Sequence, residues 1–363
     1  MRVLIASSAT GGHIYPALAI ADEIKRRDPD AEFLFVGAKW EISKGIVKSA
    51  GYEQVNIDLS GGFSRKNLLS NFKTLLDLLK SSAEIKKIIK TFKPDICIGT
   101  GGYIAGPVIR GARKAGIRTF IQEQNVIPGV ANKLAERYAD KVFVGFDESI
   151  KYFKDSRKIV VSGNPVRKIF SEVSSKRTEF REKYGVPEDA FCVLFLGGSQ
   201  GAEAINSAAA DVIEKLNGNY HFIMITGRDY YSEYEQKYKN QASARVCVMD
   251  YSDDIFEIYV AADLIVARAG ALTVTEIAAS GRASILIPSP NVTNNHQYYN
   301  AKTLTDAGAA ILLTDDEIGH GKLASEISKL ATDPEIIENM SEAASKISKR
   351  NALKVIVDEI LGS

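Results

Sequence analysis

Short apolar runs alternate with longer segments of helical spacing along almost the whole chain, and this alternation constrains the fold more than any other feature of the sequence. Apolar runs bounded by Gly, Pro and Asp and separated by helices are typical of parallel sheets with crossover helices. The pattern therefore predicts an α/β protein. In the first half of the chain we expect strands at Val3–Ala6, Glu32–Val36, Gln54–Ile57, Ile96–Gly99, Thr119–Gln122, Val142–Val144 and Ile159–Val161.

The series of strands restarts in the second half, which predicts a second doubly wound sheet, and a length of 363 residues also favours two domains. Gly163-Asn164-Pro165 is a strong turn signal between the two series, so we expect a first domain at residues 1–163 and a second at 164–349. The polar segment Ser171–Asp189 is expected to be a linker that leads into the second domain. The strands of the second sheet are expected at Phe191–Leu196, His221–Ile225, Arg245–Met249, Leu264–Ala267, Ser284–Ile287 and Ala310–Leu312.

The two halves differ in charge. Residues 1–160 hold 26 Lys or Arg against 17 Asp or Glu, whereas residues 161–363 hold 20 against 28. The formal net charge of the whole chain is only +1, which argues against nucleic acid as a partner. No stretch reaches the roughly 18 apolar residues of a membrane-spanning helix. We therefore expect a cytoplasmic protein, with peripheral attachment to a membrane left open.

The first expected strand runs into a glycine-rich turn, Ser7-Ser8-Ala9-Thr10-Gly11-Gly12-His13, with a helix expected to begin near Tyr15. Glycines in a strand-to-helix turn let backbone N–H groups approach a phosphate or sugar at the positive end of the helix. His13 lies at the carboxyl end of a strand, where Rossmann-like sheets bind ligands. A tight turn with His13 as a capping side chain explains the same residues equally well.

A second glycine-rich turn, Gly197-Gly198-Ser199-Gln200-Gly201, opens the second series of strands. The hydroxyl of Ser199 and the amides of the following helix are suited to a diphosphate without any lysine. The turn matches neither the P-loop pattern GxxxxGK[ST] nor the dinucleotide pattern GxGxxG, which disfavours a nucleoside triphosphatase and a dinucleotide-binding enzyme. The loops also lack HExxH, CxxC, GxSxG and DxD, the usual signatures of metal catalysis and serine hydrolysis.

Further polar positions follow expected strands or begin helices. Glu276 lies one to two turns into an otherwise apolar helix, where an unpaired carboxylate is costly, and it is suited to accept hydrogen bonds from the two hydroxyls of a ribose. Asn294–Asn300 is rich in amide groups that suit a sugar, although a capped surface helix also explains it. Gly99–Tyr103 and Gln122–Asn125 each end a strand, so we expect them at the same sheet edge as His13.

Seven segments together resemble the MurG family of bacterial N-acetylglucosaminyltransferases, over nearly the whole chain and in the family's order: TGGHIYPALAIA, GGYIAGP, EQNVIPGVANK, SGNPVR, GGSQGA, ARAGALTVTEIAASG and NNHQYYNAKTL. The resemblance implies two Rossmann-like domains that face a cleft, which is the GT-B arrangement. In related folds the last helix crosses back to the first domain, and the corresponding helix here is expected at Ala352–Leu361. It implies a metal-independent inverting transferase without a cofactor. Such an enzyme moves GlcNAc from UDP-GlcNAc to undecaprenyl-diphosphate-MurNAc-pentapeptide (lipid I) and forms lipid II for peptidoglycan.

The resemblance also implies roles for individual residues. The Gly197–Gly201 loop would face the diphosphate, Glu276 the ribose, and Gln297 with Asn125 the sugar. His13 is the candidate base or acceptor contact, and Glu123 is a rival base. Ser8-Ala9, Gln122 and Ser252 depart from the usual family pattern. The residues implied to bind substrate are Thr10, Gly11, Gly12, Asn125, Arg167, Ser199, Gln200, Gly201, Ser252, Ala271, Leu272, Thr273, Val274, Thr275, Glu276 and Gln297.

Three other functions remain open at this stage: a UDP-GlcNAc 2-epimerase, a related transferase with another lipid acceptor such as diacylglycerol, and a non-catalytic UDP-sugar-binding subunit. A lipid acceptor implies peripheral contact with the cytoplasmic face of the cell membrane. The segment Gly61–Pro94 holds eight basic and two acidic residues interleaved with leucines, which is suited to an anionic membrane surface. A solvated basic helix packed on the first sheet is the alternative.

Overall fold

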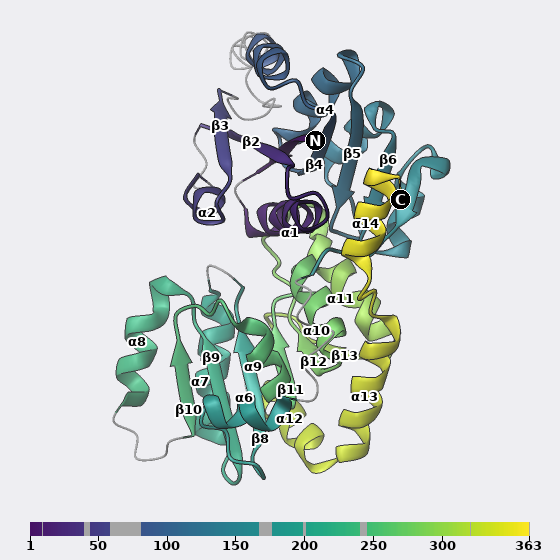
Figure 1. Cartoon of the computed structure of the whole chain (residues 1–363). Helices are drawn as coiled ribbons and strands as arrows, with labels where there is room; N and C mark the ends of the chain where they lie inside the picture. Colours follow the sequence, from purple (N-terminus) through teal and green to yellow (C-terminus); the bar gives the residue numbers. More distant parts are fainter. Residues whose placement is uncertain are drawn as a thin grey trace, which may run out of the picture. The chain divides into compact units, whose positions relative to one another are not determined.

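The computed structural model describes residues 1–8, 10–39, 44–58, 81–166, 176–198, 201–239, 245–319 and 321–362. The chain forms two compact units (Figure 1). Unit 1 combines Met1–Val166 with Asn351–Ser363, and unit 2 is Arg167–Arg350. Each unit contains one wholly parallel sheet, so the predicted architecture of two doubly wound α/β domains is confirmed.

The sheet of unit 1 has seven strands in the order β3-β2-β1-β4-β5-β6-β7. Every strand expected from the sequence is present, with bounds that differ by no more than two residues at either end. The order reverses its direction between β1 and β4, which is the position where open α/β sheets bind ligands outside the carboxyl ends of the strands. The strands are β1 (Arg2–Ser7), β2 (Glu32–Ala38), β3 (Glu53–Ile57), β4 (Ile96–Gly101), β5 (Arg118–Glu123), β6 (Lys141–Val144) and β7 (Ile159–Val161).

Helices cover both faces of this sheet because its strands are apolar on both sides. In β1, Val3 and Ile5 belong to one buried cluster, with α1, while Leu4 and Ala6 belong to another, with α4. Residues 81–92 are also helical and supply Ile85 to the second cluster. The helices of unit 1 are α1 (Gly11–Arg27), α2 (Lys44–Ser49), α4 (Ala105–Lys114), α5 (Val130–Ala135) and α14 (Ala352–Leu361), with short 3-10 turns η1 (Glu136–Tyr138), η2 (Asp147–Tyr152) and η3 (Ser156–Lys158).

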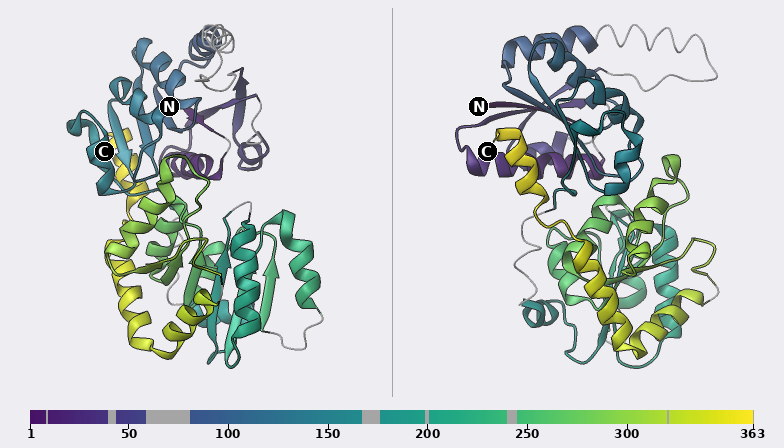
Figure 2. Two further views of the ribbon diagram at one scale, coloured as in Figure 1. Left: turned by 180° about the vertical axis from the view of Figure 1, so that it is seen from behind. Right: turned by 90° about the vertical axis from the view of Figure 1, so that its right-hand side faces the viewer.

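Helix α14 belongs to unit 1 although it follows all of unit 2 in the sequence. Figure 2 shows this last helix in yellow beside the purple α1. Ile356, Val357 and Ile360 are buried in the same cluster as Val3 and Ile5. An ion pair between Arg27 of α1 and Asp358 of α14, 2.5 Å long, joins the two helices at the surface. The end of the chain therefore completes the core of the unit in which the chain begins.

The six-stranded sheet of unit 2, in the order β10-β9-β8-β11-β12-β13, repeats the arrangement of β1 to β6 in unit 1, around an apolar core of its own. All six strands expected from the sequence are present. The strands are β8 (Phe191–Leu196), β9 (Tyr220–Ile225), β10 (Val246–Met249), β11 (Leu264–Ala267), β12 (Ala283–Leu286) and β13 (Ala310–Leu312). The helices are α6 (Arg177–Lys183), α7 (Glu203–Lys215), α8 (Arg228–Lys239), α9 (Ile255–Ala261), α10 (Ala271–Ser280), α11 (His296–Asp306), α12 (Lys322–Thr332) and α13 (Pro334–Ile347), with the 3-10 turn η6 (Thr293–Asn295).

The expectation of a linker at Ser171–Asp189 is wrong for its second half, because Arg177–Lys183 forms α6 and packs on unit 2. Phe180 is buried and meets the ring of Phe256 edge to face. Arg181 is also buried and donates a hydrogen bond to Asp263, which precedes β11. One aromatic ring and two guanidinium groups, those of Arg177 and Arg181, which both pair with Asp263, anchor a helix whose other residues are polar. Composition alone therefore misidentifies it.

Candidate active site

Helix α1 begins at Gly11, four residues before the expected start near Tyr15, so that expectation is wrong. The carbonyl of Thr10 accepts hydrogen bonds from the amides of His13 and Ile14, at 2.9 and 3.1 Å. The glycines expected to form a turn are therefore the first helical residues. Amides in the first turn of a helix have no intrahelical acceptor, so the N–H groups of Gly11 and Gly12 are suited to an anionic or sugar ligand.

The loop after β4 approaches the β1–α1 loop closely because it contains two glycines with positive φ. A Cβ on Gly101 (φ 120°) would lie 2.6 Å from Nδ1 of His13, and one on Gly102 (φ 79°) would lie 2.1 Å from Cβ of Ser8. The amide of Ser8 donates to the carbonyl of Gly101 at 3.3 Å. The structure thus brings the two strand ends together at the expected sheet edge.

His13 also contacts the strand after that. Its Nδ1 lies 2.9 Å from Oε1 of Gln124, which follows β5 and is 1% exposed. Gln124 stands in the motif EQNVIPGVANK, but the motif predicts no separate role for it. His13 itself is half-buried and lies where three strand ends meet, so it is suited to act on a ligand at this edge.

Glu123, the rival base, is buried and surrounded by hydrogen-bond donors. One carboxylate oxygen accepts from the amide of Asn125 at 2.9 Å and from its side chain at 3.2 Å. The other accepts from the amide of Gly129 at 3.0 Å and from Nδ2 of Asn132 at 2.8 Å. These four bonds make Glu123 the organiser of the loop between β5 and α5, and that loop holds Asn125 in place.

In unit 2, the glycine loop after β8 also depends on close backbone approach. Gly201 has a φ of 81°, and a Cβ there would lie 2.1 Å from the carbonyl oxygen of Thr226. A Cβ on Gly197 would lie 2.3 Å from the amide nitrogen of Ala202. Helix α7 follows at once, as the motif requires. Arg167, Ser199 and Gln200 lie outside the described residues.

Helix α10 contains six of the predicted positions and divides them between core and surface. Ala271 and Val274 are buried, whereas Leu272, Thr273, Thr275 and Glu276 are half-buried. Oε2 of Glu276 accepts a hydrogen bond of 3.3 Å from the hydroxyl of Tyr259 on α9. Burial and the charge of Glu276 raise the pKa of the Tyr259 phenol well above its usual value, so it stays protonated and donates to the carboxylate. Tyr259 therefore provides a hydrogen-bond partner for this carboxylate within an otherwise apolar helix.

The remaining predicted residues of unit 2 are in loops and at helix starts. Oε1 of Gln297, near the start of α11, accepts from the amide of Ser289 at 2.9 Å. Asn300, on the same helix, is buried and donates to the carbonyl of Ala269 at 3.3 Å. The hydroxyl of Ser252 accepts from the amide of Asp254 at 3.2 Å. Helix α11 is thus tied to loops that follow β11 and β12, at the carboxyl edge of the sheet.

Arg268 has a structural role that its sequence motif does not predict. Its guanidinium forms a two-bond ion pair with Asp315, which follows β13, and donates to the carbonyl of Ile287, which follows β12. Arg268 itself follows β11. One side chain therefore fixes the ends of three strands around the loop that leads into α10. The motif placed Arg268 in the right segment, but only the fold shows that Asp315 is near.

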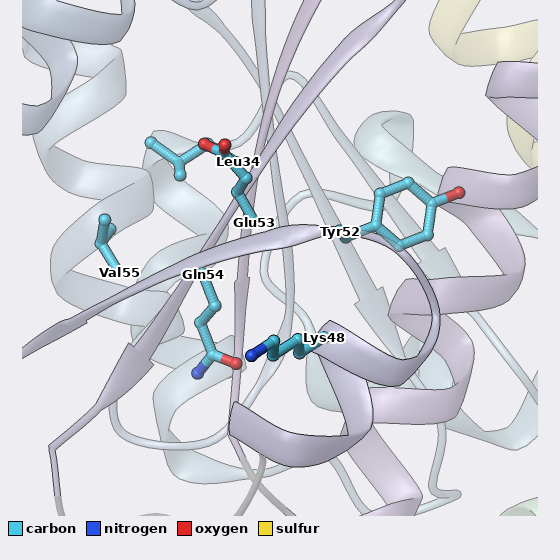
Figure 3. A pocket seen from close by; sticks show the side chains of 6 residues that line it. All are labelled: Leu34, Lys48, Tyr52, Glu53, Gln54 and Val55. Carbon is cyan, nitrogen blue, oxygen red and sulfur yellow. The ribbon is translucent and has the colours of Figure 1, made fainter.

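A pocket of about 290 Å³ also lies in unit 1, beside the edge strand β3 (Figure 3). It contains none of the predicted site residues. The residues that line the pocket are Leu34, Lys48, Tyr52, Glu53, Gln54 and Val55.

Among the residues that the structure describes, no group of three His, Cys, Asp or Glu is placed to hold a metal ion. Within the same residues, no helix is long and apolar enough to cross a membrane.

Both halves of the chain match models of one enzyme family. Residues 3–144 match the glycosyltransferase family 28 N-terminal domain, and residues 192–359 match the glycosyltransferase family 28 C-terminal domain. The two sheets with glycine loops at their carboxyl edges therefore belong to a family 28 glycosyltransferase, which is the class of protein that the fold and the candidate site define.

Individual relatives narrow this class. The chain is 40% identical to a protein of Thermoanaerobacter sp. (strain X514) over 359 residues, which cover 98% of each chain. It is 41% identical to a protein of Alkaliphilus oremlandii over 362 residues, 99% of this chain and 98% of the other. Both relatives are named UDP-N-acetylglucosamine--N-acetylmuramyl-(pentapeptide) pyrophosphoryl-undecaprenol N-acetylglucosamine transferase. The chain belongs to this MurG family of transferases.

Solved structures agree with this assignment. The crystal structure of MurG from Acinetobacter baumannii matches with a TM-score of 0.79 and 26% identity, over 100% of this chain and 99% of the other. A UDP-GlcNAc 2-epimerase of Neisseria meningitidis bound to UDP-GlcNAc matches with a TM-score of 0.68 but only 13% identity, over 100% of both chains. The second match concerns the fold alone.

Proposed function

We propose that the chain transfers GlcNAc from UDP-GlcNAc to the MurNAc of lipid I and so forms lipid II, with inversion at the anomeric carbon. The observation that carries this proposal is the identity of about 40%, over nearly the full length, to relatives named for this reaction. The carboxyl edges of both sheets support it, since each offers a glycine loop and polar side chains of the kind that bind a sugar nucleotide.

The donor would bind mainly to unit 2. The glycine loop that ends at Gly201 and the first amides of α7 would contact the diphosphate, together with Ser199, Gln200 and Arg167. Glu276 would accept hydrogen bonds from the ribose hydroxyls, and its position beside Tyr259 supports this role because a held carboxylate loses little freedom on binding. Gln297 and Asn125 would contact the sugar. Ser252 would lie near the uracil.

The reaction requires one bond to form and one to break. The acceptor hydroxyl oxygen bonds to the anomeric carbon, while the bond from that carbon to the diphosphate oxygen breaks and UDP leaves with the electron pair. His13, as neutral imidazole, would take the proton of the acceptor hydroxyl. Backbone amides of the glycine loop would stabilise the charge that develops on UDP. We propose His13 rather than Glu123 as the base because four donors already surround the carboxylate of Glu123.

The assay that tests the proposal incubates the full chain with labelled UDP-GlcNAc and lipid I, and measures UDP release with and without the acceptor. Formation of the disaccharide only when lipid I is present supports the proposal. Epimerised donor, transfer to diacylglycerol alone, or donor binding without turnover would each replace it with one of the three rival functions.

His13→Ala tests the assignment of the base. A general base contributes roughly 10²–10⁴-fold to turnover, so kcat should fall by about this factor while the KM for UDP-GlcNAc changes little. Steady-state kinetics on the purified variant, with its circular dichroism as a check of folding, measure both constants. Turnover close to that of the wild type would remove His13 from the mechanism.

We also propose that unit 1 contacts the cytoplasmic face of the membrane through the basic segment Gly61–Pro94, since the acceptor is a polyprenyl lipid. In the described part of this segment, Ile85 and Ile89 are buried against the sheet, while Lys86, Lys87 and Lys90 are exposed. Each lysine near an anionic surface contributes about 1 kcal/mol to binding. The leucines of the segment fall at residues 68–79, outside the described residues.

Co-sedimentation with vesicles tests this contact. Binding should require anionic lipid, weaken with salt, and fall in the triple variant Lys73→Glu, Lys80→Glu and Lys87→Glu. The matched control changes three exposed lysines of unit 2, Lys237, Lys322 and Lys346, to glutamate and should bind as the wild type does. Equal binding to neutral vesicles, or an unaffected first variant, would contradict the proposal.

A further inference from the structure

A chain of buried amide side chains leads away from His13 inside unit 1. Gln124 meets His13, Gln122 meets Gln124, and Asn164 meets Gln122. Each of the three amides is at most 1% exposed. An amide buried in this way has to satisfy both its oxygen and its NH₂ group within the protein, so its orientation is determined by its neighbours.

Backbone carbonyls anchor both ends of this chain. Nε2 of Gln124 donates to the carbonyl oxygen of Thr100 at 2.7 Å. Because a carbonyl oxygen only accepts hydrogen bonds, the side-chain oxygen of Gln124 cannot take this position. Nε2 of Gln124 also lies 2.5 Å from Oε1 of Gln122. At the far end, Nδ2 of Asn164 donates to the carbonyl of Gln124 at 2.9 Å, which leaves its oxygen to accept from Nε2 of Gln122 at 3.0 Å. The orientation of all three amides is thereby set.

With its NH₂ group occupied, Gln124 presents its oxygen to His13. An amide oxygen only accepts, so the imidazole has to carry a proton on Nδ1 to form the contact of 2.9 Å. We infer that Gln124 is a positioning residue that fixes His13 as the Nδ1–H tautomer and leaves Nε2 as the nitrogen that takes the proton of the acceptor. This inference rests on the proposed role of His13 as the base.

Two glycines make room for the arrangement. A Cβ on Gly145 would lie 2.5 Å from both Nδ2 and Oδ1 of Asn164, and a Cβ on Gly101 would lie 2.6 Å from Nδ1 of His13. Any larger residue at either position would displace a member of the chain. The same contact that selects the tautomer also restricts rotation of the imidazole, as the second partner of a reactive histidine commonly does.

The tautomer can be measured directly by ¹⁵N NMR on the full chain with labelled histidine. The chain has only four histidines, and His13→Ala identifies the signals of His13 by their loss. In the wild type at a pH where His13 is neutral, we expect the proton on Nδ1. In Gln124→Met, which removes the acceptor but keeps a buried side chain of similar length, the preference for Nδ1–H should be lost.

The matched control is Gln122→Met. It disturbs the same buried chain but leaves Gln124 bonded to Thr100 and to His13, so the Nδ1–H tautomer should persist. A proton on Nε2 of His13 in the wild type would overturn the inference, and this measurement needs no variant of Gln124 that folds. Persistence of Nδ1–H in a folded Gln124→Met variant would overturn it as well.

Kinetics separate this inference from the proposed function. Gln124→Met should lower kcat by roughly 10-fold or more and leave the KM for UDP-GlcNAc nearly unchanged, because only the base is misplaced. A general loss of folding would change both constants. If His13→Ala keeps full turnover, the proposed base is wrong, whatever the tautomer. If His13→Ala is inactive and Gln124→Met is fully active, the base stands and the positioning role of Gln124 fails.

Discussion

Glu276 shows how a charged side chain is kept in an apolar helix. It is half-buried on α10, between the buried residues Val274 and Ile277, and the protonated phenol of Tyr259 donates to it. A carboxylate in this setting accepts a further hydrogen bond without reorganising, which suits it to a pair of neighbouring hydroxyls. The sequence singled out Glu276 as a carboxylate in an apolar helix, and its contact with a ribose stays a prediction. Its partner Tyr259 is 17 residues away, and only the packing of α9 on α10 places it there.

Glu276→Ala should raise the KM for UDP-GlcNAc by 10-fold or more, because hydrogen bonds to a charged group are worth roughly 1.5–3 kcal/mol each. The variant should remain folded, since the side chain is half-buried rather than in the core. Tyr259→Phe keeps the carboxylate and should therefore raise the KM for UDP-GlcNAc by a smaller factor than Glu276→Ala does. Isothermal titration with UDP-GlcNAc and steady-state kinetics measure the effect; unchanged donor affinity in folded Glu276→Ala would make the carboxylate structural.

At the scale of elements, apolar periodicity was sufficient to predict the thirteen strands found in the described part of the chain, because strands buried on both faces are continuous apolar runs. Helix ends were harder to predict. Gly11 and Gly12 read as a turn but begin α1, and α6 is short and polar yet anchored by Phe180 and Arg181. The contacts between loops, such as His13 with Gln124 or Arg268 with Asp315, join residues far apart in the sequence. Spacing along one chain carries no information about them.

Gly101→Ala tests the loop approach that involves His13 directly. Alanine at a φ of 120° is strained by about 1–3 kcal/mol, and its Cβ would press on Nδ1 of His13. We expect a lower melting temperature and a fall in kcat, with donor affinity retained because Glu276 and the donor loop of unit 2 are unaffected. Gly106→Ala, on α4, is the control: its Cβ would meet no atom nearer than 3.8 Å. Full activity of Gly101→Ala would mean that His13 can move without loss.

At the scale of the whole molecule, two sheets with the same strand order carry the same kind of loop at the same place. The first strand of each unit, β1 or β8, lies beside the strand where the order reverses, and each is followed by a glycine-rich turn and a helix. Each unit has its own apolar core. Repetition of one architecture within the chain thus gives each unit one sheet edge of the kind at which open α/β sheets bind ligands.

Stability of the chain should decrease between about pH 6.5 and pH 4 because of His221. This side chain of β9 is buried, and burial, with a smaller effect of Arg181, lowers its pKa from 6.5 to about 4. The folded state keeps it neutral while the unfolded state binds a proton, so acid favours unfolding by up to about 3 kcal/mol. Below pH 4 both states are protonated and the loss levels off.

Urea unfolding at a series of pH values measures this effect. In His221→Phe the slope of stability against pH between 6.5 and 4 should be smaller than in the wild type. His296→Gln, at a half-buried position at the start of α11, is the control variant. An identical slope in His221→Phe would assign the acid sensitivity to other groups.

Because it contains helix α14, unit 1 can complete its core only when synthesis of the chain is nearly finished. A ribosome makes residues 1–166 first, yet Ile356, Val357 and Ile360, which complete their core, emerge only after all of residues 167–350. Part of an apolar face of unit 1 therefore stays uncovered until α14 has been synthesised, and apolar surface exposed in this way favours aggregation. A stop codon at position 352 should consequently destabilise unit 1, although most of that unit is encoded at the other end of the gene. Limited proteolysis of the truncated product should digest unit 1 before unit 2.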